Sequence, residues 1–246
     1  MYITTKIKSV NEFEDSWFEE AYNTLPKWRK DRSDSIKDES SRRTSILAGK
    51  MVNDAFIENG EDPENVIFTE KGKALAGSGS AFCFSISHSK NAVAVSYLEL
   101  DGQYSSLPAD NRIDATSVFS AASIPPRSDL KSTRGLSRPS VGVDIEYVRE
   151  HDLRIAERFF TAEEQEYINH SFDHNENFTR IWTSKEAFGK FTGGGIEDGL
   201  KFSMFHDPLK PMDVVLPCFF EYAEKNVDGE KYLYTICYGV QEEKDD

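Results

Sequence analysis

The chain has 246 residues, of which 38% are hydrophobic and 29% are charged, and its formal net charge at pH 7 is -14. This length allows one large domain or two small ones, with a sizeable core and a well-hydrated surface. So acidic a chain is a poor general binder of nucleic acid, because basic surfaces supply most of that affinity. The charge still allows a local basic patch that binds one phosphorylated small molecule.

The three cysteines, Cys83, Cys218 and Cys237, are widely spaced and form no Cys-x-x-Cys pair. They therefore indicate neither a zinc site nor a disulfide framework. The first ten residues lack the apolar core of a secretory signal, and no apolar run reaches the length of a membrane span. We expect a protein of the reducing cytoplasm that makes no membrane contact.

The N-terminal region begins with an alternating segment, residues 2–7, that predicts a strand. Asn11 followed by Glu14 predicts a capping box for a helix that runs to about Tyr22. The local charge then reverses, because residues 25–50 contain eight lysines and arginines against four acids. These cations can form either an exposed helix face with ion pairs or an anion site, and the residues alone leave both open.

A helix with apolar residues at four-residue spacing is predicted next, ending near Asn59-Gly60. Residues 66–69 predict a short strand, and residues 70–73 a turn with two lysines. Residues 82–87 alternate strictly and predict a strand, followed by a turn at His88 and a hairpin partner over residues 92–98. A histidine in a turn is usually only solvated, but binding residues also gather at such strand ends.

Residues 101–140 differ in kind, because fifteen of the forty are Ser, Pro or Gly and no periodicity is visible. We expect a mobile insertion between two folded parts. The hexapeptide Val141–Glu146 follows and predicts a strand with Asp144 and Glu146 on one face and apolar residues on the other. Two adjacent carboxylates repel unless cations or a hard metal ion such as Mg²⁺ lie near them. For this hexapeptide taken alone, a solvated strand edge is the more frequent arrangement.

The C-terminal region predicts a helix from a capping box at Thr161 to about His170, and a longer one over residues 176–191. On the longer helix, Trp182, Glu186 and Lys190 follow at four-residue spacing and share one stripe. A surface ion pair explains the two charges, yet the indole indicates partial burial, where a glutamate needs a cation. If this helix packs on the acidic strand, three carboxylates converge and require a metal ion.

The glycine run at residues 193–195 ends that helix. It is no P-loop, because it follows a helix and no Gly-Lys-Ser/Thr comes after it. The remainder predicts strands over residues 200–205, 217–222 and 231–238.

Two motifs in this order resemble the paired motifs of the 4′-phosphopantetheinyl transferases. They are Gly142-Val143-Asp144-Ile145-Glu146 and, about forty residues later, Trp182-x-x-Lys185-Glu186-Ala187-x-x-Lys190. Either motif alone is weak, whereas the two together at this spacing are specific. The upstream Phe84-Ser85-Ile86-Ser87-His88-Ser89 resembles a third element of the family. The resemblance runs from about residue 25 to 196, and the length is similar to that of the longer, surfactin-synthetase-activating type.

The resemblance implies an α+β fold in which one monomeric chain forms a pseudo-dimer of two similar halves. Each half would be a small antiparallel sheet packed with helices. The N-terminal half would span residues 1–100 and bind the phosphates of coenzyme A, the insertion residues 101–140, and the C-terminal half residues 141–246. No internal repeat is visible in the sequence, so this architecture rests on the resemblance.

The resemblance also implies a Mg²⁺-dependent transferase, with Mn²⁺ as a substitute ion. It would move the 4′-phosphopantetheine arm of coenzyme A onto a serine of an apo acyl, peptidyl or polyketide carrier protein and release adenosine 3′,5′-bisphosphate. Asp144, Glu146 and Glu186 would hold the ion. Glu186, a metal-bound water or Lys190 would take the serine proton. The residues expected to contact coenzyme A are Lys27, Lys30, Arg43, Lys73, Ser87, His88, Asp144 and Lys190.

Two other functions stay open on the residues alone. A Mg²⁺-dependent phosphohydrolase would use the same carboxylates with water as nucleophile, and a binding module would use the acidic strand only as structure. Two features depart from the family pattern. The insertion is longer than the usual connection and lies near the expected carrier site, and the acidic charge disfavours acidic carriers. Docking is therefore expected to use apolar contacts and local basic patches.

Overall fold

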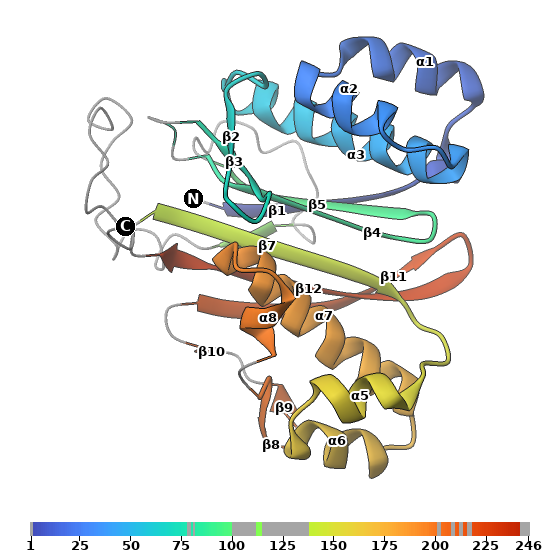
Figure 1. Cartoon of the computed structure of the whole chain (residues 1–246), viewed down its shortest axis with the longest axis vertical. Helices are drawn as coiled ribbons and strands as arrows, with labels where there is room; N and C mark the ends of the chain where they lie inside the picture. The colour runs from blue at the N-terminus through green and yellow to red at the C-terminus, as the bar shows by residue number, and fades with distance from the viewer. Residues whose placement is uncertain are drawn as a thin grey trace.

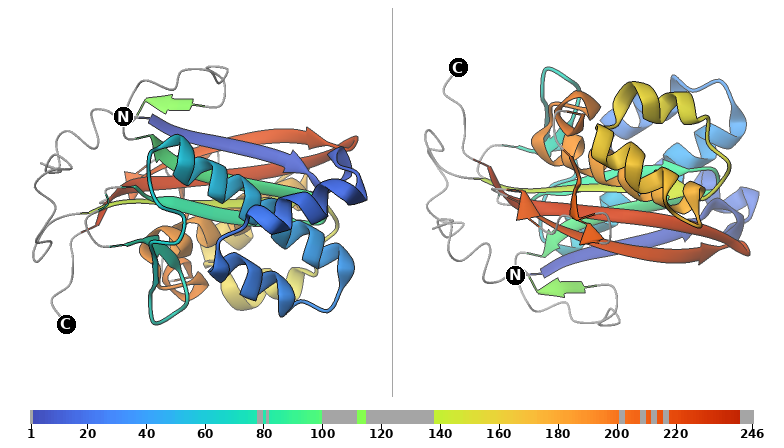
Figure 2. Two further views of the ribbon diagram at one scale, coloured as in Figure 1. Left: turned by 90° about the horizontal axis from the view of Figure 1, so that it is seen from above. Right: turned by 90° about the horizontal axis from the view of Figure 1, so that it is seen from below.

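The computed structural model describes residues 2–77, 80, 82–99, 112–114, 138–200, 203–207, 210–211, 214–215 and 218–241. The fold is α+β, with two antiparallel four-stranded sheets in the middle and helices on their outer faces (Figure 1). Helices of the N-terminal part cover one side and helices of the C-terminal part the other, as the views from above and below confirm (Figure 2). Among the described residues, no helix is both long and apolar enough to cross a membrane.

The N-terminal sheet has the strand order β4-β5-β1-β6. Its elements in chain order are β1 (Tyr2–Ser9), the 3-10 turn η1 (Val10–Glu12), α1 (Asp15–Thr24), α2 (Lys27–Asp34), α3 (Glu39–Glu58), β2 (Val66–Phe68), β3 (Ala74–Ala76), β4 (Phe84–Ser89), β5 (Ala92–Glu99) and β6 (Arg112–Asp114). Strands β2 and β3 form a separate two-stranded sheet.

The C-terminal sheet has the strand order β10-β11-β12-β7. Its part of the chain contains β7 (Arg138–Tyr147), α5 (Leu153–Phe159), α6 (Ala162–Asn169), α7 (His174–Thr192), α8 (Ile196–Gly199), β8 (Phe205–Asp207), β9 (Lys210–Pro211), β10 (Val214–Val215), β11 (Cys218–Val227) and β12 (Glu230–Gln241). Strands β8 and β9 pair with each other apart from the main sheet.

The two parts repeat one plan. Each begins with a strand, β1 or β7, continues through helices, and closes with a hairpin, β4–β5 or β11–β12. In both, the second hairpin strand pairs antiparallel with the opening strand. This repeated order corresponds to the two similar halves that the resemblance implies. The boundaries at residues 100 and 140 stay predictions; β6 lies inside the expected insertion and β7 begins at Arg138. The prediction that residues 101–140 are mobile falls mostly outside the described residues.

Three hydrophobic cores lie between the layers of sheets and helices. The alternation of side chains along each strand determines which core a residue enters. On β5, Val93 and Val95 face the core under the N-terminal helices, while Ala94 and Leu98 face a second core between the sheets. On β7, Val141, Val143 and Ile145 lie in this second core between the sheets. The opposite face of β7 carries Gly142, Asp144 and Glu146. The predicted separation of apolar and acidic residues along β7 is therefore confirmed.

Helix α7 packs on that acidic face at very short range. A Cβ atom built on Gly142 would lie 2.0 Å from the carbonyl oxygen of Ala187, so only glycine allows this approach. Helix α7 thus packs on the acidic strand, which is the condition under which the sequence brings the three carboxylates together. Helix α7 ends at Gly193, whose φ of 75° is left-handed, in agreement with the expected stop at the glycine run.

Three local predictions differ from the structure. The capping box belongs to Ser9 and Glu12 at the 3-10 turn, because β1 continues to Ser9 and its hydroxyl accepts the amide of Asn11; Glu14 precedes α1 without a side-chain cap. His88 lies inside β4, which runs to Ser89 and leaves a turn of two residues, Lys90 and Asn91. Of the described residues within the strand expected over 200–205, Phe205 alone is in a strand, where β8 begins.

Candidate active site

The two halves meet where β4 runs beside β7, and serine hydroxyls form the joint. Ser85 Oγ accepts the backbone N–H of Val143 at 3.0 Å, and Ser89 Oγ accepts that of Tyr147 at 3.2 Å. Because β7 is an edge strand of its sheet, the N–H groups on its free side need such partners. Serine hydroxyls at alternate positions of β4 thus accept hydrogen bonds that backbone carbonyls of a neighbouring strand would accept in a continuous sheet. We call this joint the serine seam, formed by Ser85, Ser87 and Ser89.

The serine seam also holds the two carboxylates of β7. Ser87 Oγ donates to Asp144 Oδ1 at 2.7 Å, and Ser89 Oγ donates to Glu146 Oε2 at 2.7 Å. Asp144 is 4% exposed, and its other oxygen, Oδ2, is buried without a hydrogen-bond partner in the described part of the chain. A buried carboxylate oxygen without a partner is costly, so this atom is suited to a ligand that supplies positive charge.

Helix α7 brings the third carboxylate and a cation to the same place. Lys190 Nζ lies 2.7 Å from Asp144 Oδ1. Burial raises the pKa of Glu186, and repulsion from Asp144 and Glu146 raises it further, against the attraction of Lys190. Burial likewise raises the pKa of Glu146, assisted by Asp144 and opposed by the hydrogen bond from Ser89. The three carboxylates therefore influence one another, as expected if they converge.

The oxygen-only donor set and the unpartnered Asp144 Oδ2 suit a hard ion such as Mg²⁺. Within the described ranges, however, no three histidine, cysteine or carboxylate side chains stand close enough to hold an ion as they are placed. The ammonium of Lys190 is the cation in contact with Asp144. The donor chemistry thus fits a metal ion, and the ion itself stays a proposal.

An open cavity of about 820 Å³ adjoins this cluster between the halves. Of the predicted coenzyme A contacts, Lys73, His88 and Lys190 line it. The cavity also has cationic lining residues that sequence reasoning did not assign. These are Arg29, Arg32 and Lys71.

Arg29 is buried in the cavity wall without an acidic partner among the described residues. Its Nη2 donates to the carbonyl of Ser45 at 2.6 Å, while its Nε has no hydrogen-bond partner there. Burial lowers the pKa of Arg29 to about 10, and the neighbouring Arg32 contributes. A buried guanidinium of this kind favours an anion. The two arginines lie three residues apart on one helix, and that spacing was the available sequence signal.

The other predicted cations of this region do not line the cavity. Lys27 is exposed and pairs with Asp31, and Lys30 donates to a backbone carbonyl at residue 23. Arg43 pairs with Asp15 and Glu39. Their assignment to coenzyme A stays a prediction, and the structure gives Lys27 and Arg43 the ion pairs of exposed helix faces.

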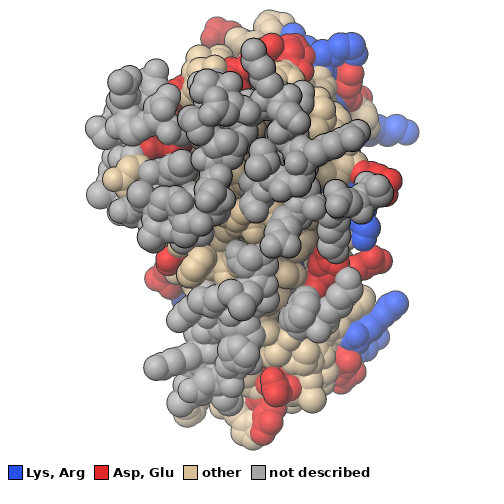
Figure 3. All heavy atoms as spheres, turned by 90° about the vertical axis from the view of Figure 1, so that its left-hand side faces the viewer, with Lys and Arg blue, Asp and Glu red and all other residues tan. Residues whose placement is uncertain are grey.

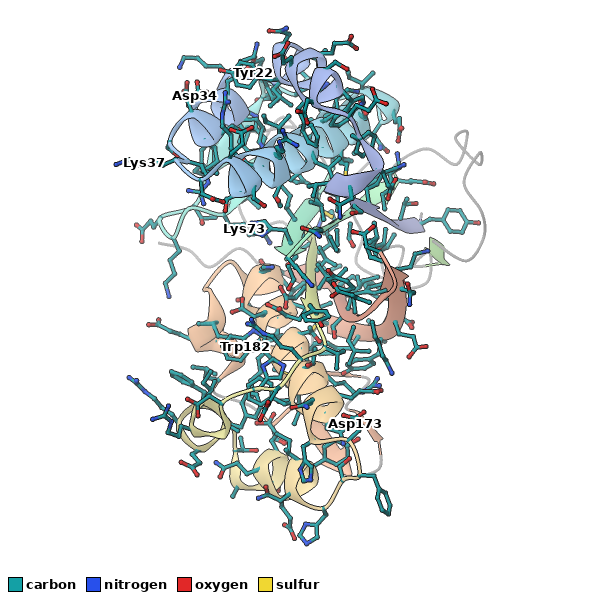
Figure 4. All side chains as sticks on the ribbon, turned by 90° about the vertical axis from the view of Figure 1, so that its right-hand side faces the viewer. Tyr22, Asp34, Lys37, Lys73, Asp173 and Trp182 are labelled. Carbon is teal, nitrogen blue, oxygen red and sulfur yellow. The ribbon has the colours of Figure 1, made fainter. Side chains whose placement is uncertain are left out.

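Lys73 lies at the junction of the halves, where Figure 4 labels it between the N-terminal helices and Trp182 of α7. Its Nζ donates to Ser140 Oγ at 3.1 Å and to the carbonyl of Phe191 at 3.0 Å. No carboxylate of the described residues forms an ion pair with it. Burial lowers the pKa of Lys73 to about 8. Its ammonium is therefore available to an anion that enters the cavity.

His88 projects into the cavity as an exposed residue. The surrounding protein lowers the pKa of His88 by desolvation, and the positive charges of Lys190, Arg29 and Arg32 act in the same direction. The neutral imidazole is thus favoured near pH 7, where it donates or accepts a hydrogen bond rather than carrying charge.

The cations of the cavity contrast with the outer surface. On the face seen in Figure 3, the described acidic and basic side chains are intermixed.

Comparison with known proteins gives one family match, in the half that carries α7 and β7, and further matches to curated relatives. Residues 140–237 match the model of the 4′-phosphopantetheinyl transferase superfamily. The 4′-phosphopantetheinyl transferase psf-1 of Bacillus pumilus is 48% identical over 62 residues, which cover 24% of this chain and 27% of that protein. The 4′-phosphopantetheinyl transferase ffp of Bacillus subtilis is 32% identical over 105 residues, covering 39% and 46%. The chain thus matches between about a quarter and a half of the length of these curated relatives.

Proposed function

We propose that this chain, whose residues 140–237 match the model of the 4′-phosphopantetheinyl transferase superfamily, is a member of that superfamily and transfers the 4′-phosphopantetheine arm of coenzyme A to a serine of an apo carrier protein. The proposal rests on one observation, which is that residues of opposite charge meet at the junction of the halves. Arg29 and Lys73, which have no acidic partner among the described residues, line a cavity at the junction of the halves. Lys190 of the same lining contacts Asp144, one of the three carboxylates expected to hold the ion. A phosphorylated substrate placed there meets both kinds of charge.

Coenzyme A binding is supported by the cations that have no acidic partner. Arg29 and Lys73 each hold a charge without a described carboxylate, so a phosphate would relieve the cost of burying it. Arg32 and His88 line the same cavity and extend the set of donors. Lys190, which connects the cavity to Asp144, is suited to the pyrophosphate.

Asp144, Glu146 and Glu186 would hold Mg²⁺, which would supply positive charge to the pyrophosphate during transfer. The serine seam keeps Asp144 and Glu146 oriented for this role. Of the groups expected to accept the serine proton, we assign the role to Glu186, because serine hydroxyls hold Asp144 and Glu146 and leave Glu186 as the carboxylate outside the serine seam. Lys190 already donates to Asp144, which suits a charge-neutralising role.

The reaction balances with these groups. The serine oxygen forms a bond to the β-phosphorus of coenzyme A, and Glu186 takes the proton. The bond from that phosphorus to the bridging oxygen breaks, and the electron pair leaves with adenosine 3′,5′-bisphosphate. Preorganised cations around the phosphates stabilise the charge that develops. The expected monomeric state and cytoplasmic location belong to the same proposal.

The test is transfer of a fluorescent coenzyme A analogue to a panel of apo carrier proteins in the presence of Mg²⁺. We expect labelling by the wild type and its loss in D144A and E186A, with R180M on the same helix as the control that keeps it. Labelling at the wild-type rate in both acidic variants would refute the proposal. Rapid nucleotide release from coenzyme A without a carrier would instead favour a phosphohydrolase. A variant lacking residues 103–138 would show whether that segment selects the carrier.

A further inference from the structure

A completely buried ion pair lies in the C-terminal half, away from the cavity. Glu164 on α6 and Lys185 on α7 are both 0% exposed, with Lys185 Nζ 2.9 Å from Glu164 Oε2. The carboxylate also accepts two backbone amides, from Thr161 at 2.8 Å and from Met204 at 2.8 Å. The ammonium donates to the carbonyl of Gly199 at 3.3 Å. The pair therefore links α6, α7, the end of α8 and the segment at Met204.

Stability alone does not explain this pair. Removing two charges from water carries a desolvation cost that their attraction only partly repays, and apolar residues of similar size are often equally stable there. A buried pair differs from an apolar contact in its directionality, because each charged atom has fixed partners. The pair therefore restricts geometry more than it lowers free energy.

The restricted geometry is the rotation of α7 about its own axis. A Cβ atom on Gly199 would lie 2.3 Å from the carbonyl oxygen of Lys185, so α8 rests directly on the backbone of α7 at this residue. On the other side, a Cβ atom on Gly142 of β7 would lie 2.0 Å from the carbonyl oxygen of Ala187. Lys185 is thus held by its side chain and its backbone, and the next residue is Glu186.

We infer that Glu164 and Lys185 are positioning residues, which fix the rotation of α7 and so direct Glu186 and Lys190 toward Asp144. Neither positioning residue lines the cavity. The inference rests on the proposed function for its kinetic consequence, but its structural consequence is independent of it. Displacing a catalytic carboxylate by about 1 Å can reduce a rate about a hundredfold.

The test compares E164Q/K185M, which removes both charges at similar volume, with R180M, which removes the charge of a partly exposed ion pair on the same helix. We expect the double variant to fold with a lower urea midpoint than R180M, because a glutamine has one acceptor oxygen where the carboxylate serves two backbone amides. Its kcat for carrier labelling should fall by at least about tenfold, with KM for coenzyme A within about twofold. Amide hydrogen exchange over residues 183–190 should become faster in the double variant alone.

The single variant E164D keeps both charges but shortens the acidic side chain by one methylene, and it provides the same comparison should the double variant not fold. A folded variant with kcat close to that of R180M and unchanged exchange over residues 183–190 would overturn the inference. A wild-type protein without transfer activity would refute the proposed function instead. Hydrogen exchange would then still decide whether the pair holds α7 in place.

Discussion

Replacing Lys73 with methionine tests whether the cavity carries an unneutralised charge. The lowering of the pKa of Lys73 from 10.5 to about 8 corresponds to about 3 kcal/mol of unfavourable burial at neutral pH. Part of the residue is exposed, and solvent screening reduces the expected effect to about 1–2 kcal/mol. The carbonyl of Phe191 loses one donor but keeps Ser140 Oγ and Gln241 Nε2. We therefore expect K73M to be more stable than the wild type at pH 7 by about 1–2 kcal/mol.

The sign of the pH dependence follows from the same shift. Between pH 8 and 10.5 the unfolded chain binds more protons at Lys73 than the folded chain does, so wild-type stability rises with pH through this window. K73M lacks that rise, and the difference between the two proteins should vanish near pH 10.5. KM for coenzyme A should increase in K73M at pH 7, because a phosphate loses its cation.

The assay is urea unfolding followed by tryptophan fluorescence at pH 7 and at pH 10.5. K71M, which removes an exposed lysine of the same turn, serves as the control and should change stability by less than about 0.5 kcal/mol. A K73M protein that is less stable than the wild type at pH 7, or a difference that is the same at both pH values, would refute the reasoning.

Three further substitutions probe other parts of the site. R29M should raise KM for coenzyme A by about tenfold or more, since a charge-assisted hydrogen bond is worth about 1.5–3 kcal/mol. The control K27M should leave KM unchanged, and equal effects of the two substitutions would contradict the placement of Arg29 in the cavity wall. G142A should cost about 1–3 kcal/mol in thermal unfolding, because its methyl group meets the backbone of α7, and wild-type stability would disprove that close approach. S89A should cost about 1–3 kcal/mol by leaving Glu146 and a backbone amide without a partner, and S89T should recover part of it in the same urea titration.

The acidic strand could be predicted from the sequence because its information is local. A period of two places Asp144 and Glu146 on one face, whatever lies opposite. The cavity cations could not be assigned in this way. Helix α2 has the sequence KWRKDRSD, with one apolar residue, so no hydrophobic stripe defines the face that turns inward. The resemblance pointed to Lys27 and Lys30, while packing turns Arg29 inward.

The Glu164–Lys185 pair shows a second limit of sequence reasoning. Its partners lie on different helices, and the capping box at Thr161 already accounted for Glu164 in the sequence. Only the packing of α6 against α7 brings the two charges together. Local patterns therefore indicate which residues carry charge and which face they share, whereas the pairing of distant charges depends on tertiary contacts.

The core between the two sheets has a consequence for how the molecule unfolds. Residues of β1 and β5 share this core with residues of β7 and β12, and the serine seam adds bonds that cross from one half to the other. Neither sheet can lose its partner without exposing apolar surface to water. The halves should therefore unfold together in one cooperative transition, and a destabilising substitution in one of them should lower the hydrogen-exchange protection of both.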